Sequence, residues 1–125
     1  MARIQALGKD VLAGAAGSPG ITRHMAFVGE GFQIVRSRID AGVVSGWHHH
    51  GDYDLYGYMV SGTAHFEDGP GGRDVTSVGP GDFFHLPART VHRDVNPSTT
   101  EGQEIIVFLR GAGPIVVNVD GPDPG

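Results

Sequence analysis

Closely spaced glycine and proline residues are the feature that most constrains the fold of this chain. The 125 residues include 21 Gly and 8 Pro, which divide the sequence into short apolar runs without a collagen-like period. An average helix needs about 11 residues free of such breaks, whereas an average strand needs about 5. We therefore expect an all-β protein of about nine or ten short strands joined by tight turns.

The apolar runs between the turns indicate where the strands lie. We expect strands at 21–28, 32–39, 43–50, 55–60, 63–67, 73–78, 83–86, 90–95, 105–109 and 115–119. Residues 1–20 are expected to form a flexible N-terminal segment or an edge strand, and residues 120–125 a disordered tail. The remainder, residues 21–119, has the size of one domain.

Composition excludes several classes of partner and chemistry. The formal net charge is −5 and no basic cluster accompanies it, which argues against nucleic acid as a partner. The absence of Cys excludes disulfides, thiolate ligands and a cysteine nucleophile. No apolar run is long enough to cross a membrane. We expect a cytoplasmic protein.

The run His48–His50 is the strongest chemical signal in the sequence. Side chains alternate along a strand, so His48 and His50 would share one face and His49 would occupy the other. A third imidazole from a distant strand would complete three corners of a metal site. A solvated loop or a tag remnant would give the same run, but its internal position after Trp47 favours the metal site.

Two segments carry regularly spaced Gly, His, Pro and Asn residues. The first follows the pattern GxxxxxHxH with a later glycine, at Gly42, His48, His50 and Gly62. The second follows GxxxxxPxGxxHxxxN, at Gly81, Pro87, His92 and Asn96, with Arg89 at the inner glycine position. Together they resemble the two motifs of the cupin family over about residues 30 to 110. The resemblance implies a double-stranded β-helix, the cupin jelly-roll barrel.

The resemblance also implies a divalent metal ion, either Fe, Zn, Ni or Mn, bound by His48, His50 and His92. The glutamate ligand of the family would fall at Leu55, which cannot bind a metal, and Asp54 is one residue away. A one-residue offset turns a strand side chain to the opposite face unless a bulge restores it. A three-histidine site is therefore expected, and Asp54 remains an alternative fourth ligand.

A three-histidine site would leave open positions on the ion, which is the pattern of catalytic rather than structural sites. We expect a dioxygenase-type enzyme acting on a small anionic oxygenated molecule. A Lewis-acid isomerase, lyase or cyclase, and a non-catalytic binding protein, are the alternatives. His85 and Asp54 are the candidate catalytic residues.

A homodimer is also expected, because apolar runs near both ends of the chain could pair at an edge. The candidate contact residues are Ile4 and Leu7 with strands 105–109 and 115–119.

Overall fold

The computed structural model describes residues 2–8, 12–14 and 18–124 of the chain. These described residues contain eleven strands and a short 3-10 turn at Pro70–Gly72. The strands are β1 (Ala13–Gly14), β2 (Ile21–Gly29), β3 (Phe32–Ile39), β4 (His48–His49), β5 (Asp54–Ser61), β6 (Ala64–Asp68), β7 (Asp74–Val78), β8 (Phe83–Leu86), β9 (Arg93–Val95), β10 (Gln103–Arg110) and β11 (Val117–Asn118).

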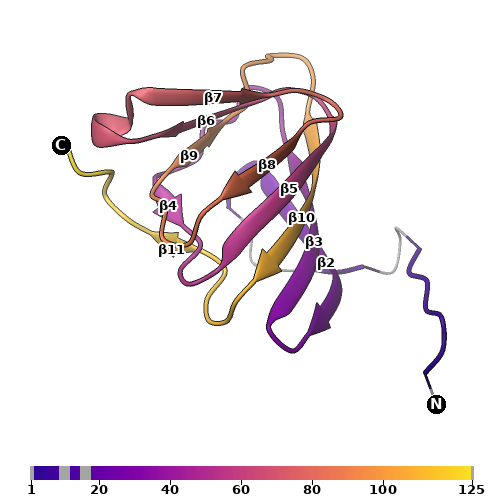
Figure 1. The fold of residues 1–125 in the computed structure, drawn as a ribbon. Coiled ribbons are helices and arrows are strands. Elements are labelled where there is room, and N and C mark those ends of the chain that lie inside the picture. The colour runs from indigo at the N-terminus through magenta and orange to yellow at the C-terminus, as the bar shows by residue number, and fades with distance from the viewer. Residues whose placement is uncertain (1, 9–11, 15–17, 125) are drawn as a thin grey trace.

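These strands form two facing layers, shown in Figure 1. One layer is a six-stranded sheet with the order β1-β2-β3-β10-β5-β8. The other contains the three-stranded sheet β7-β6-β9 and the pair β11-β4. Every strand pair within the described part of the chain is antiparallel. The expected double-stranded β-helix is confirmed.

The core lies between the two layers because each strand points alternate residues inward. On β5, Leu55 and Met59 are buried, and on β10 the buried positions include Val107 and Leu109. The facing layer contributes apolar side chains such as Phe66 to the same cluster. The interior is thus apolar on both sides, and any polar group inside it needs a specific partner.

Three expected strands are much shorter in the structure than the sequence indicated, and of the range 115–119 only Val117–Asn118 is a strand. Only His48–His49 of the range 43–50 is a strand, although Val44 makes an isolated bridge to Val95. In the range 90–95, only Arg93–Val95 is a strand, preceded by the bridge between His48 and His92. The backbones of these two segments nevertheless lie side by side along their length.

The ends of the chain lie against the barrel at particular points. In the N-terminal segment, β1 pairs with β2, while residues 2–8 contain no strand. Residues 120–124 also contain no strand, but the Asp123 carbonyl oxygen accepts a hydrogen bond from the Gly71 amide. This contact places one point of the tail beside the 3-10 turn, and the expected disorder of residues 120–125 stays a prediction. Among the described residues, no helix is long and apolar enough to cross a membrane.

The position of β10 corrects one expectation about subunit pairing. Strand 105–109 was expected to offer an open edge, but β10 lies between β3 and β5 and is hydrogen-bonded on both sides. Within the expected strand 105–109, the outward side chains Ile106 and Phe108 reach the surface. A partner could contact this face but could not extend the sheet at β10.

Candidate metal centre

Direct backbone pairing brings His48 and His92 together across 44 positions of sequence. The His48 amide donates to the His92 carbonyl oxygen and the His92 amide donates to the His48 carbonyl oxygen, both at 2.9 Å. Residues opposed in this way project their side chains to the same face. The two imidazole ring centroids are consequently 4.4 Å apart.

His50 completes the cluster because alternation along the chain returns it to the face of His48. The rings of His48 and His50 have centroids 5.2 Å apart, and those of His50 and His92 are 5.1 Å apart. One ring nitrogen from each histidine lies within 4.8 Å of the others, and all three residues are buried. The structure therefore brings together the three histidines that the sequence predicted as ligands.

Hydrogen bonds to backbone carbonyl groups fix the tautomer of each ring. His48 Nδ1 donates to the Gly46 carbonyl oxygen at 2.8 Å, and His92 Nδ1 to that of Thr90 at 2.8 Å. His50 Nδ1 donates to the Ile115 carbonyl oxygen at 2.7 Å. A carbonyl oxygen only accepts, so each Nδ1 holds the proton and each neutral ring keeps a lone pair on Nε2.

The Nε2 atoms of His48 and His92 are buried and make no hydrogen bond within the described residues. Buried polar atoms without a partner are rare in proteins and call for an explanation such as a bound ion. Ligating histidines commonly donate their other ring N–H to a backbone carbonyl, as these three do. The three residues therefore fit a divalent metal ion.

Burial favours the neutral, metal-binding form of the His48 and His50 imidazoles. It lowers the pKa of His50 from 6.5 to about 3, and the neighbouring His92 adds to this shift. Burial also lowers the pKa of His48, although the charge of Asp94 opposes the effect. Near neutral pH neither ring needs to lose a proton before it binds a cation.

The two candidate catalytic residues pair with each other at the surface rather than with the histidine cluster. His85 Nε2 lies 3.0 Å from Asp54 Oδ1, and both side chains are about 40% exposed. The hydrogen bond with His85 is the main cause that lowers the pKa of Asp54. Leu55, the next residue, points inward and is buried. No bulge turns Asp54 towards the cluster, because β5 pairs with β8 in regular register from Leu55 onward.

His85 also borders a hollow of about 80 Å³ that extends to His92. Phe66, Phe84 and Thr90 are among the other residues around it. His85 can therefore reach a molecule in this hollow, whereas Asp54 does not line it.

Asp94 is a buried carboxylate beside the cluster that sequence reasoning missed. Its Oδ2 lies 3.5 Å from His48 Nε2, and its Oδ1 lies 3.6 Å from His92 Nε2. The signal was available in the sequence, because Asp94 stands two residues after His92 and shares its face of the strand.

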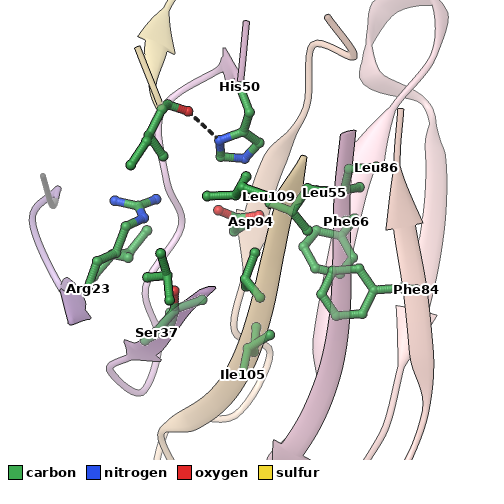
Figure 2. A pocket seen from close by; sticks show the side chains of 15 residues that line it. Arg23, Ser37, His50, Leu55, Phe66, Phe84, Leu86, Asp94, Ile105 and Leu109 are labelled. Atoms are coloured by element: carbon green, nitrogen blue, oxygen red, sulfur yellow. Dashed lines mark hydrogen bonds between the residues drawn. The ribbon is translucent and has the colours of Figure 1, made fainter. Parts of the chain in front are cut away.

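A cavity of about 40 Å³ lies between the two layers beside His50 and Asp94, as Figure 2 shows. Most of its lining is aliphatic or aromatic, but Arg23 of β2 and Ser37 of β3 also face it. Arg23 and Ser37 are opposed in the β2–β3 register. Burial lowers the pKa of Arg23, whereas the charge of Asp94 raises it.

Comparison with known proteins agrees with this architecture. A model of the cupin domain matches residues 35–108, which is more than half of the chain. The chain belongs to the cupin family. No curated protein matches its sequence.

Solved cupin structures superpose on most of this chain. KdgF from Halomonas sp. is 25% identical, with a TM-score of 0.68, over 84% of this chain and 93% of its own. The polyketide cyclase RemF from Streptomyces resistomycificus is 16% identical, with a TM-score of 0.76, over 94% of this chain and 86% of its own. Oxalate decarboxylase from Bacillus subtilis is 18% identical, with a TM-score of 0.72, over 95% of this chain and 33% of its own. RemF and oxalate decarboxylase are less than 25% identical to this chain, so these two matches show a shared fold alone.

The second motif departs from the family pattern at a conformationally demanding position. Arg89 stands where the pattern has glycine, and its φ is 61°, the left-handed region that glycine adopts most readily. Its amide donates to the Gly51 carbonyl oxygen at 2.9 Å, and its guanidinium pairs with Asp52. The backbone geometry of the motif is therefore retained despite the substitution.

Proposed function

We propose that this cupin is a metal-dependent enzyme acting on a small anionic oxygenated organic molecule. The observation that carries the proposal is the convergence of three buried imidazoles whose Nδ1 protons are held by carbonyl groups. Such a set presents three Nε2 lone pairs to one cation. Fe, Zn, Ni and Mn all accept imidazole ligands, and the test below identifies which one is bound.

The cavity supports a small substrate with one charged end. A volume of about 40 Å³ corresponds to roughly three water-sized groups. Arg23 and the Ser37 hydroxyl would hold an anionic group, and the apolar walls would exclude bulk water. The positive charge of Arg23 in a largely apolar wall favours a carboxylate or an enolate over a neutral molecule.

For the reaction class, we favour dioxygen chemistry. Three neutral ligands leave the ion its full charge and at least one open position, where it can activate an anionic substrate or dioxygen. Within the chain, Leu55 replaces the family carboxylate, and His48, His50 and His92 carry no ligand charge.

Lewis-acid isomerisation, elimination or cyclisation is the second candidate, and Asp94 is the observation that favours it. A buried carboxylate beside the cluster could accept a proton from the carbon next to a carbonyl group. Such a reaction requires no dioxygen, so the two classes separate in one experiment.

The test begins with anaerobic purification and elemental analysis of wild type and the His92→Ala variant. We expect one equivalent of metal per wild-type chain and little in the variant. Stoichiometric metal in the folded variant would refute the assignment. Oxygen uptake with small carboxylic, enolic and phenolic acids would support the dioxygenase, and anaerobic turnover of one of them the Lewis-acid enzyme. Stoichiometric metal without any turnover would identify a binding protein.

A further inference from the structure

The contacts of Asp94 with the histidine cluster are of an unusual kind. Each carboxylate oxygen faces a different Nε2, at 3.5 Å for His48 and 3.6 Å for His92. The Nδ1 atoms of both rings donate to carbonyl groups, so in the neutral rings both Nε2 atoms hold lone pairs. The lone pairs of the Asp94 oxygens thus face the lone pairs of the two Nε2 atoms in a buried site. A positive charge between them would stabilise this arrangement.

The distances identify what that charge could be. A separation of 3.5 Å is longer than the range of about 2.7 to 3.2 Å for an N–H···O hydrogen bond. Two ligands bound at about 2.1 Å to one tetrahedral ion are about 3.4 Å apart. Each separation is close to this spacing, with Oδ2 of Asp94 facing His48 and Oδ1 facing His92, so a carboxylate between the two rings could share a cation with them.

The surrounding residues hold the carboxylate in this position. The Asp94 amide donates to Ser45 Oγ at 2.8 Å, and the Ser45 amide donates to the Asp94 carbonyl oxygen at 2.8 Å. These bonds fix the strand so that Asp94 shares the face of His92. Arg23 lines the same cavity and provides the opposite charge that a buried carboxylate needs.

We propose that Asp94 supplies a fourth, carboxylate ligand to the ion held by His48, His50 and His92. The carboxylate missing at Leu55 of β5 is thus replaced from β9, on the opposite layer of the barrel. This inference rests on the metal site of the proposed function. It would reduce by one the charge that the ion presents to a substrate and fill the fourth position of a tetrahedral ion, so a substrate or dioxygen would bind as a fifth ligand. It would also exclude Asp94 as the base of the Lewis-acid alternative.

Metal binding measured directly tests this role. Metal-free wild type, Asp94→Asn and Asp54→Asn would be titrated with Zn²⁺ against a competing chromogenic chelator. We expect Asp94→Asn to bind at least tenfold more weakly, because the isosteric amide has lost its charge. Asp54→Asn is the matched control, since its carboxylate is exposed and bound to His85, and it should bind as wild type does.

A cobalt spectrum distinguishes a ligand from a nearby charge. The chain contains no Cys, so a thiolate-to-cobalt charge-transfer band in Asp94→Cys can arise only from the new side chain. We expect this band with Co²⁺ in Asp94→Cys and none in Asp54→Cys. The variant also keeps the test valid if Asp94→Asn folds poorly.

Two results would overturn the inference. One is wild-type affinity in Asp94→Asn, and the other is a folded Asp94→Cys that binds Co²⁺ without the band. If His92→Ala still loses its metal in either case, the three-histidine site and the proposed function stand. If His92→Ala keeps its metal, the proposed function itself fails.

Discussion

Replacing Gly57 with alanine should destabilise the barrel even though alanine suits its backbone. Gly57 has no positive φ, so the exchange alone would stabilise the fold by about 0.4 to 1 kcal/mol through the unfolded state. A Cβ at residue 57 would, however, lie 2.5 Å and 2.6 Å from Cε1 and Cε2 of Phe84, and closer still to Cζ. Ordinary carbon contacts are about 3.5 to 4.0 Å, so the ring would have to retreat by roughly 1.5 Å.

Overpacking of this kind costs about 1 to 3 kcal/mol, which exceeds the backbone gain. We expect a net loss of about 1 kcal/mol, measured as a shift of roughly 0.5 M in the midpoint of urea unfolding. Gly46→Ala is the matched control, because no atom lies within 4 Å of its added Cβ and its φ is not positive. It should be neutral or slightly stabilising.

A double-mutant cycle with Phe84→Leu identifies the ring as the cause. With the smaller side chain at residue 84, Gly57→Ala should become neutral or stabilising, and the two changes should not be additive. Gly57→Ala at or above wild-type stability, or strict additivity, would refute the reasoning. Because Phe84 lines both the central cavity and the hollow beside His85, the same exchange should also alter which substrates fit.

Four further predictions follow from the site and the surface. Burial lowers the pKa of His50 from 6.5 to about 3, so below pH 6.5 the unfolded chain binds a proton that the metal-free fold excludes. Stability should therefore fall by about 1 kcal/mol between about pH 7.5 and 5.5 in urea titrations, and a flat or rising profile would contradict this. Asp54→Asn should retain its metal in elemental analysis, and loss of the ion would restore Asp54 as a ligand. Arg89→Gly should raise the free energy of unfolding in urea by about 1 kcal/mol, because relief of the left-handed strain outweighs loss of the exposed ion pair with Asp52. An unchanged midpoint would argue against that strain. We also expect a homodimer of about 26 kDa, twice the 13.1 kDa chain, joined through the outer face around the 80% exposed Phe83. Sedimentation should show Phe83→Asp as a monomer, and a monomeric wild type at micromolar concentration would exclude the dimer.

Alternation along strands accounts for most of what the sequence predicted correctly. Apolar runs between Gly and Pro predicted seven of the ten expected strands at nearly their observed bounds, and parity placed His48 and His50 on one face. The same parity would have found Asp94, but a lone acidic residue beside Arg93 is indistinguishable in sequence from a solvated charge. Its burial is a tertiary property.

Contacts between distant strands could not be read from the sequence. The pairing of Asp54 with His85 depends on the register of β5 against β8, which no local pattern specifies. Arg23 was equally hidden, because an arginine on a strand next to polar Thr22 is usually exposed. Only the fold reveals that it lines the interior cavity.

The histidine site is completed by the segment around Ile115, which is synthesised after all three histidines. His50 is held by a carbonyl group 65 residues later in the chain, and β4 pairs with β11 as well as with His92. During translation His50 therefore leaves the ribosome long before its support exists, whereas His48 is held by the earlier Gly46. A nascent chain stopped after His92 would contain all three imidazoles, but His50 would lack its anchor. Metal loading should thus follow, and not guide, the closure of the barrel.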